Sequence, residues 1–401
     1  MDLDAVRAQF PLLQRQIGGR RIIYLDAAAT TPKPQRVIDS IVDYYSNHCA
    51  NIHRAAHILS EEASRLYEDA RSYLASLINA RRDEIIFVRN ATEAINTVRH
   101  SIAIRNGQNV ITTIGEHHSN FLPWLTADDV RQVGLDASGT LNLDEFAEAL
   151  DSHTAMVAVN HISNVSGIVQ PVERVIEMAH GHGARVLIDA AQSASHVELD
   201  VKKLECDYLA TSAHKMFGPT GIGALYARKQ ILEEMEPLFV GGGMALNVTN
   251  SGFEPEDLPA RFEAGTPNIA GAIGFGEAVR FLQDIGLNNI SRHDKELSSF
   301  LIRSLRELPE IEVYPDPTDH TERIGIVSFR IRGMNQDDVA SILSSRFNIM
   351  LRSGVHCAEP LIRSFRVDGV LRASTHIYNT DEEIQALIDA LKSIIATFSR
   401  Q

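Results

Sequence analysis

The sequence has 401 residues, of which 44% are hydrophobic and 22% charged, close to the averages of soluble globular proteins and unlike a disordered chain. Its formal net charge of −14 disfavours a broad electrostatic grip on nucleic acid or on an anionic membrane. Acidic residues occur early at the N-terminus and no apolar run approaches a signal peptide or a membrane span, so we expect a cytoplasmic protein. The three cysteines form no CxxC pair, so neither a disulfide framework nor a metal site is predicted.

Helical and apolar segments alternate along the chain up to about residue 280. Residues 51–80 carry apolar side chains at three- and four-residue spacing, which predicts an amphipathic helix. Short apolar runs then recur between helical stretches, at residues 84–88, 110–113, 156–159, 185–188, 208–211 and 222–226. This alternation predicts an α/β fold with a mostly parallel sheet covered by helices on both faces. Ligands bind beyond the carboxyl ends of such strands, so we expect the active site there.

The pattern changes after about residue 280. Helical stretches now alternate with apolar runs at 324–331, 349–352 and 371–374, which predicts a smaller α+β domain. Thr380 and Glu383 have the spacing of a capping box at the start of the last helix. We therefore expect a large, cofactor-binding domain over residues 20–280, and a small domain built from residues 1–19 and 281–401.

The segment SAHKMFGP, residues 212–219, follows a predicted buried strand and contains Lys215. A lone lysine usually lies on the surface. Here desolvation would lower the pKa of the amine, which would make it a usable nucleophile for an aldehyde cofactor and later a general base. The position of Lys215 therefore predicts a Schiff base with a cofactor such as pyridoxal phosphate.

A second polar group follows the preceding strand, where Val186-Leu187-Ile188 leads into Asp189. A carboxylate there can lie under a heteroaromatic ring nitrogen and keep it protonated, which turns pyridoxal into an electron sink. Gln192 would be placed to donate a hydrogen bond to the phenolate oxygen of the cofactor. A helix N-cap is the alternative role of Asp189, and a strand-to-helix junction fits both.

A phosphate site is predicted where the strand ending at Val88 passes into a helix. Backbone amides at Ala91, together with Thr92, would form an anion site at the helix N-terminus. The pattern is weak alone, because such residues cap ordinary helices. Ser212 and His214, beside the lysine, would add donors.

His117 lies in GEHHSN, again after a predicted strand. Its imidazole could stack on the pyridine face and shuttle protons. A buried structural histidine is equally compatible with the sequence.

Cys357 lies in RSGVHCAEP, a loop with glycine, proline, arginine and histidine, which suits an exposed and partly ionised thiol. Most lone cysteines are small buried hydrophobes, and we expect that of Cys206 and of Cys49.

Arg372 can offer a two-pronged contact to a substrate carboxylate, which a lysine cannot match. A structural salt bridge is the alternative.

Taken together, these segments resemble the class V aminotransferase-like family, and within it the SufS/CsdA-type cysteine desulfurases. The resemblance spans nearly the whole chain in ten ordered blocks: YLDAAATTPKP, HRAAH, NATEAIN, EHHSNFLPW, SNVSG, IDAAQSASH, SAHKMFGPTGIG, RFEAGTPNIAG, RSGVHCAEP and LRASTHIYNT. It implies the pyridoxal-phosphate-dependent transferase fold-type I, with a mostly parallel seven-stranded sheet in the large domain. It also implies a homodimer with active sites at the subunit interface.

The resemblance further assigns individual residues. Thr266 would reach the phosphate bound by the partner subunit, and His117 would stack on the cofactor ring. Asn164 would touch substrate or cofactor, and Ala28 and Arg352 would join Arg372 around the substrate.

Three features depart from the family pattern. Ala27 replaces the Asn or Ser that is common in relatives. Near the cysteine, Val355 stands where His or Gln is common, and Glu359 stands where Gln is common. The segment after Trp124 looks short, which puts the local strand and the surface beside the active site in doubt.

The predicted reaction converts L-cysteine to L-alanine and leaves the sulfur as a persulfide on Cys357 for an acceptor protein. A selenocysteine lyase or another enzyme of the same family is the first alternative. A non-catalytic sulfur relay is an alternative of another class, disfavoured by the intact set of cofactor residues. Iron-sulfur cluster assembly, tRNA or cofactor thiolation, and DNA sulfur modification all remain open as destinations of the sulfur.

Overall fold

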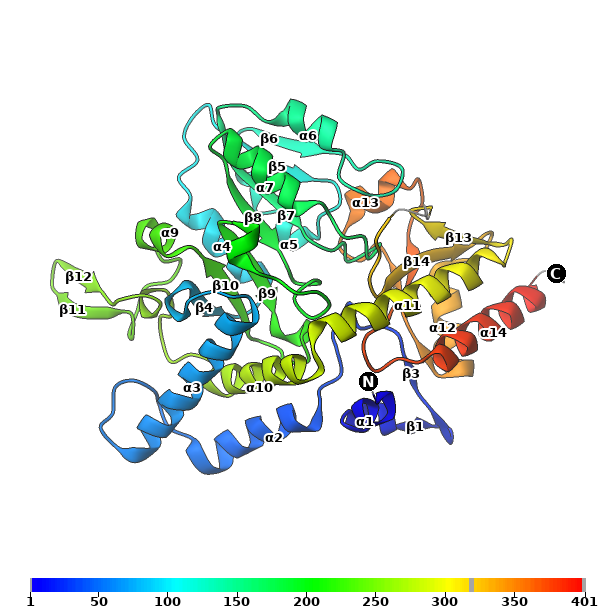
Figure 1. Cartoon of the computed structure of the whole chain (residues 1–401), viewed down its shortest axis with the longest axis horizontal. Helices are drawn as coiled ribbons and strands as arrows, with labels where there is room; N and C mark the ends of the chain where they lie inside the picture. The colour runs from blue at the N-terminus through cyan, green and yellow to red at the C-terminus, as the bar shows by residue number, and fades with distance from the viewer. Residues whose placement is uncertain (1, 317–320, 399–401) are drawn as a thin grey trace.

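The computed structural model describes residues 2–316 and 321–398 and is built around a seven-stranded sheet (Figure 1). The strands run in the order β4-β10-β9-β8-β7-β5-β6. Their bounds are β4 (Ile85–Val88), β5 (Asn109–Thr113), β6 (Val130–Val133), β7 (Thr154–Asn160), β8 (Arg185–Asp189), β9 (Tyr208–Ser212) and β10 (Gly223–Ala227). Only β10 runs antiparallel to its neighbours among these described strands. The mostly parallel sheet predicted from the sequence is therefore confirmed.

Helices cover both faces of this sheet. Successive side chains of a strand point to opposite faces, so apolar neighbours in a strand place apolar surface on both faces, and each face must be covered. In β4, Ile86 belongs to one hydrophobic cluster and its neighbour Phe87 to the other. The Phe87 face packs on α3 (Ile58–Leu77), α7 (Val172–Gly181) and α10 (Ile269–Ile285), and the Ile86 face packs on α4 (Ala91–Ser101) and α9 (Lys229–Glu234). Each buried apolar side chain contributes about 1.5–3 kcal/mol, so the two clusters hold the three layers together.

A second sheet, of four strands, has its own core near the C-terminus. The order is β13-β14-β17-β16, with β13 (Ile311–Tyr314), β14 (Ile326–Ile331), β16 (Arg352–Gly354) and β17 (Val370–Ser374). Three helices share its hydrophobic cluster, namely α11 (Leu287–Arg306), α12 (Gln336–Phe347) and α14 (Asp381–Phe398). Thr380 and Glu383 exchange hydrogen bonds at the start of α14, which confirms the predicted capping box.

The N-terminal segment joins the two cores. Phe10, just after α1 (Leu3–Ala8), packs into the large core, whereas Leu25 packs into the second. Between them β3 (Ile23–Tyr24) pairs in parallel with β15 (Ile349–Met350). The division at residues 20 and 280 stays a prediction.

The remaining elements are short or peripheral. They are α2 (Gln35–Asp43), α5 (His118–Phe121), α6 (Leu143–Ala149), α8 (Val201–Leu204), α13 (Glu359–Ser364), and the hairpins β1–β2 (Gln16–Ile17, Arg20–Arg21) and β11–β12 (Ala245–Thr249, Gly252–Pro255). Over the described residues, no helix has the length and apolar character needed to cross a membrane.

Several local predictions need correction. The helix expected over 51–80 begins at Ile58, because the preceding residues form a turn in which His53 has a φ of +68°. Asp189 is followed by turns instead of a helix. The run at 349–352 divides between β15 and β16, and the strand that seemed doubtful after Trp124 is present as β6.

Candidate active site

A cavity of about 190 Å³ lies at the carboxyl ends of the parallel strands and collects most of the predicted site residues. Those that line it are Ala28, Ala91, Thr92, His117, Asn164, Asp189, Ser212, His214, Lys215, Arg352, Cys357 and Arg372. A larger cavity, of about 600 Å³, lies elsewhere and lacks the lysine. Because the chemistry depends on Lys215 and its neighbours, the smaller cavity is the candidate active site.

Lys215 and Asp189 both line this cavity and shift each other's pKa through their opposite charges. Burial lowers the pKa of Lys215 to about 8, and the negative charge of Asp189 opposes that shift. Burial also raises the pKa of Asp189, while the positive charge of Lys215 lowers it. Asp189 Oδ1 accepts a hydrogen bond from the backbone N–H of Ala191 at 2.9 Å, so the carboxylate caps a turn and still faces the cavity.

Hydrogen bonds hold the backbone on both sides of the lysine side chain. The carbonyl of Lys215 accepts from Ser195 Oγ at 3.0 Å. The carbonyl of His214 accepts from the backbone N–H of Thr31 at 3.0 Å and from Lys33 Nζ at 2.9 Å. The amine is thus presented from a fixed backbone, as a positioned nucleophile requires.

The predicted anion site lies where α4 begins. Asn90 caps this helix, its side chain accepting from the N–H of Glu93 at 3.0 Å. The N–H of Ala91 donates to Ser212 Oγ at 2.9 Å, and Thr92 Oγ1 lies 2.7 Å from Ser119 Oγ. Hydroxyls and a helix N-terminus therefore converge, which suits a phosphate group.

His117 is a neutral imidazole at the cavity wall. Burial, followed by the nearby charge of Lys215, lowers its pKa to about 3. Its Nδ1 accepts from the backbone N–H of Ser119 at 3.1 Å, which leaves the ring proton on Nε2. The ring therefore offers a hydrogen-bond donor and an uncharged face to a bound group.

Two arginines also line the cavity. Arg352 and Arg372 stand directly across from each other on β16 and β17. The guanidinium of Arg372 donates to the carbonyl of Asn164 at 2.8 Å and to Asp26 Oδ1 at 3.2 Å. Among the described residues its buried Nε has no hydrogen-bond partner. Arg372 thus forms a structural salt bridge with Asp26, the alternative role considered from the sequence. It also keeps its Nε–H as a donor for a substrate carboxylate.

Cys357 is an exposed thiol on the loop between β16 and α13. The loop is held by Asn164 Nδ2, which donates to the carbonyl of His356 at 2.9 Å, and by the N–H of His118, which donates to the carbonyl of Cys357 at 2.8 Å.

The other two cysteines differ in burial. Cys206 is fully buried as expected, and burial raises its pKa to about 12. The expectation of a buried Cys49 is wrong: it is exposed, because it follows the turn Tyr44–His48 in a surface loop.

Two predicted residues lie outside the cavity lining. Gln192 is buried behind it, where its Nε2 donates to the carbonyl of Ala28 at 3.0 Å. Thr266 lines the 600 Å³ cavity instead. Their assigned roles stay predictions.

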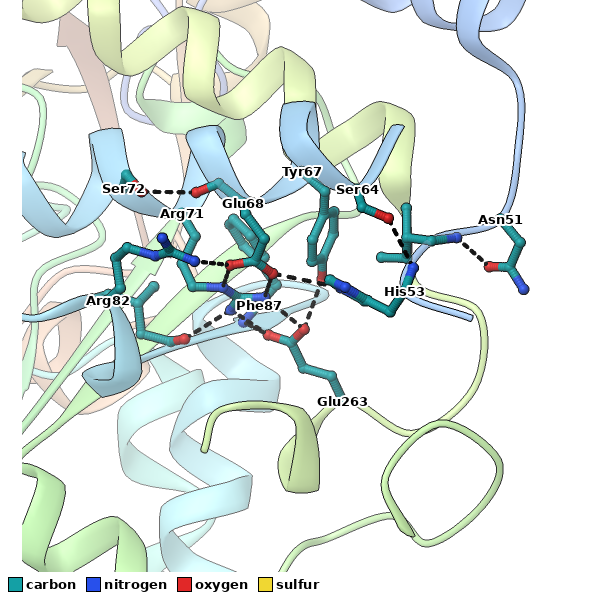
Figure 2. Close-up of polar contacts among 12 residues, drawn as sticks. Asn51, His53, Ser64, Tyr67, Glu68, Arg71, Ser72, Arg82, Phe87 and Glu263 are labelled. Carbon is teal, nitrogen blue, oxygen red and sulfur yellow. Dashed lines mark hydrogen bonds and ion pairs between the residues drawn. The ribbon is translucent and has the colours of Figure 1, made fainter. Parts of the chain in front are cut away.

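Figure 2 shows an ion-pair network around Arg71 and Glu263, both of which have buried side chains and line that larger cavity. Arg71, on α3, makes a two-pronged contact with Glu263 at 2.7 and 2.9 Å. Glu263 also accepts from Tyr67 Oη at 2.8 Å and from the N–H of Phe87 at 2.7 Å. The network therefore ties α3 and β4 to the segment that carries Thr266.

A third cluster, at the junction of the two cores, contains His196, Asp294 and His376, all buried. His196 Nδ1 lies 2.7 Å from Asp294 Oδ2, and the two imidazoles stack with centroids 4.2 Å apart and 22° between the ring planes. Stacked rings direct their in-plane lone pairs side by side instead of towards one point. This geometry suits a hydrogen-bonded stack better than a metal centre.

Sequence reasoning missed five lining residues: Ala29, Asn90, Ser119, Ala191 and His356. It also missed Asp26, the partner of Arg372. All six lie inside the blocks that carry the family resemblance, which is the signal that could have found them.

The cavity fits pyridoxal phosphate by its own chemistry. The pKa of Lys215 is low enough to supply neutral amine, Asp189 can pair with a protonated ring nitrogen, and the start of α4 suits a phosphate.

Comparison with known proteins agrees with this geometry. The aminotransferase class-V family model matches residues 23–387. A probable cysteine desulfurase from Synechocystis sp. is 44% identical, with 98% of this chain and 96% of the relative covered. The cysteine desulfurase of Haloferax volcanii is 40% identical, with 100% and 98% covered.

Solved structures agree as well. The apo structure of a cysteine desulfurase from Thermococcus onnurineus superposes with a TM-score of 0.93 at 37% identity, covering 98% of both chains. The Escherichia coli cysteine desulfurase CsdA, in an S-sulfonic acid form, gives 0.91 at 33% identity over 99% of both chains.

The chain therefore belongs to the aminotransferase class-V family, and within it to the group of the cysteine desulfurases. The predicted family, α/β fold, enzyme class and pyridoxal-phosphate cofactor are confirmed.

Proposed function

We propose that this chain, as a cysteine desulfurase, converts L-cysteine to L-alanine and carries the removed sulfur as a persulfide on Cys357. One observation carries the proposal: Cys357, Lys215 and Arg372 line the same cavity although they come from different segments of the chain. A thiol, a low-pKa amine and a carboxylate-binding guanidinium are the three groups that this reaction needs.

Each group has a defined task. Bound pyridoxal phosphate supplies an electron sink for the charge left on the substrate Cα. Arg372 holds the substrate carboxylate, which places Cα near Lys215. The Lys215 amine, once displaced by the substrate, takes the Cα proton. Asp189 would stabilise the positive charge of the protonated ring nitrogen of the cofactor.

Sulfur transfer is the task of Cys357. Its thiolate attacks the substrate sulfur, so that a sulfur–sulfur bond forms while the carbon–sulfur bond breaks and its electron pair stays with the substrate carbon. Protonation of that carbon, the substrate Cβ, and return of a proton from the Lys215 amine to Cα give alanine. The persulfide sulfur is then available to a thiol of an acceptor protein, whose identity and pathway remain open.

A homodimer is part of the proposal. Thr266 and the loop at Asn51–Arg54 line the 600 Å³ cavity, which carries no nucleophile for the reaction in its own chain. The surrounding surface exposes large apolar side chains, including Ile58 at 70% and Val248 at 71% exposure. The hairpin β11–β12, which bears Val248, projects from the body of the molecule (Figure 1). A second copy of this chain covering that surface would bring Thr266 towards the partner's phosphate site.

A cytoplasmic location of the protein also stays a proposal.

The test compares wild type with Cys357→Ala and with Cys49→Ser, which removes an exposed thiol that does not line the cavity. Each purified holoenzyme is incubated with L-cysteine, and alanine and protein persulfide are measured. We expect both products from wild type and Cys49→Ser, and neither from Cys357→Ala, with the same visible absorption in all three. Alanine formation by Cys357→Ala would overturn the role of Cys357. A coloured wild type that consumes only selenocysteine would favour the selenocysteine lyase, and a colourless inert protein the non-catalytic relay.

A further inference from the structure

The Cys357 loop is fastened to the cavity wall by one residue that contacts it twice. The backbone N–H of His118, the first residue of α5, donates to the carbonyl of Cys357 at 2.8 Å. The imidazole Nε2 of the same residue contacts the carboxylate of Glu359, the first residue of α13. The two contacts are made by Cys357 and Glu359, on either side of Ala358, so His118 holds the loop at the cysteine itself and two residues after it.

The loop needs such fastening because its backbone is strained. His356 and Cys357 have φ values of +53° and +54°, the left-handed region that non-glycine residues avoid at a cost of about 1–2 kcal/mol each. A strained turn persists only where its surroundings hold it. Besides the His118 contacts, two hydrogen bonds hold this turn: Asn164 Nδ2 donates to the carbonyl of His356, and the N–H of Ala358 donates to the carbonyl of Val355 at 3.0 Å.

The same His118 contacts connect the Cys357 loop to the part of the cavity wall that contains His117. His117, which lines the cavity, directly precedes His118, and its own ring is fixed by the N–H of Ser119. A shift of the Cys357 loop away from His118 would therefore change the distance between the thiol and the substrate without moving Lys215 or Arg372. The side chains of His118 and Glu359 are 30% and 38% exposed, while Glu359 Oε2, the contacting oxygen, is buried. The contact is an ion pair when His118 is protonated, and a pair between partly exposed side chains is moderate in strength.

We propose that His118 and Glu359 form a latch that positions the exposed Cys357 thiol over the cavity, and that its opening lets the loop carry the thiol away from the cavity. The inference rests on the proposed role of Cys357. Both partners are positioning residues, since neither needs to touch the reacting atoms. Glu359 is also one of the positions at which this chain departs from the family pattern, in which Gln is common there.

The test measures opening and chemistry separately. In a Cys49→Ser background, iodoacetamide reports the accessibility of Cys357, since Cys206 is buried. We compare Glu359→Ala, Glu359→Gln and the conservative Glu359→Asp, with Glu177→Gln as a matched control in an exposed ion pair on α7. Alkylation should be roughly two- to fivefold faster in the Ala variant and less so in Gln, as expected for a moderate ion pair. Asp should approach the wild-type rate, and the control should equal it.

The kinetics should follow the same order. We expect kcat for alanine formation to fall by roughly the same factor in Glu359→Ala, while KM for cysteine and the absorption spectrum stay unchanged because the binding groups are intact. At a pH at which His118 is protonated, added salt should speed alkylation of wild type and leave Glu359→Ala unaffected, which a merely structural role would not predict. Replacing His118 by Gln in the Glu359→Gln variant should add no further acceleration.

Equal alkylation rates in wild type and Glu359→Ala would overturn the latch. So would a loss of activity in Glu359→Ala that comes with a changed spectrum and a raised KM. If wild type makes no alanine at all, the proposed function fails, yet the alkylation rates still decide the latch.

Discussion

Asp189 and Lys215 share one buried cavity because Asp189 ends β8 and Lys215 follows the end of the neighbouring strand β9. The parallel arrangement brings both residues to the same edge of the sheet. Burial lowers the pKa of the Lys215 amine and the negative charge of Asp189 raises it, so that the pKa of Lys215 is about 8. The pair therefore sets the pH at which Lys215 becomes nucleophilic.

The first prediction concerns cofactor loading. Only the neutral amine of Lys215 attacks the aldehyde, so the rate at which apo-protein takes up pyridoxal phosphate should rise with pH and level off above about 8. In Asp189→Asn the attraction is lost, the charged amine is less favoured, and the profile should shift to lower pH. The growth of visible absorption after mixing measures the rate. A profile that shifts to higher pH, or does not move, would contradict the assigned pairing.

The second prediction concerns the substrate carboxylate. Arg372→Lys keeps the positive charge but loses the second prong, so we expect kcat/KM for cysteine to fall by roughly 10- to 100-fold, mainly through KM. Steady-state alanine formation measures this, with Arg174→Lys, an exposed residue on α7, as the control. An unchanged KM would mean that another group, with Arg352 the first candidate, binds the carboxylate.

The residues that carry chemistry could be found from the sequence because their signals are local. Asp189 ends a strand, and Lys215 and Thr92 each follow one within a few residues; strand ends of a parallel sheet meet at one edge. The family resemblance then supplied Asn164 and Thr266, which no local pattern indicates.

What the sequence did not reveal depends on contacts between distant segments. Asp26 meets Arg372 because the segment that follows β3 bridges to the end of β17 through Asp26 and Ser374. Glu263 meets Arg71 across 192 positions. The exposure of Cys49 was missed for the same reason, since burial is decided by how neighbouring segments pack and not by the residues beside it.

The third prediction concerns the buried network of Figure 2. Glu263→Gln would leave the buried guanidinium of Arg71 without its charged partner, so we expect the free energy of unfolding to fall by about 3–5 kcal/mol. Urea unfolding measures it. Glu177→Gln, in an exposed pair, should change stability by less than about 0.5 kcal/mol. A small effect in Glu263→Gln would mean that Glu68, which also contacts Arg71, suffices to hold the charge.

The last prediction concerns Gly223, the first residue of β10. A Cβ added there would lie 2.5 Å from the carbonyl oxygen of Thr211 and 2.8 Å from Cα of Asn90. Both are backbone atoms and cannot move aside cheaply, so Gly223→Ala must displace Asn90, which caps α4 at the predicted phosphate site. We expect weaker binding of pyridoxal phosphate, measured by titration of the apo-protein. A matched control is Gly181→Ala, at the end of α7, where an added Cβ has no atom within 4 Å and binding should be unaffected. Tight cofactor binding by a stably folded Gly223→Ala would show that the phosphate is held elsewhere.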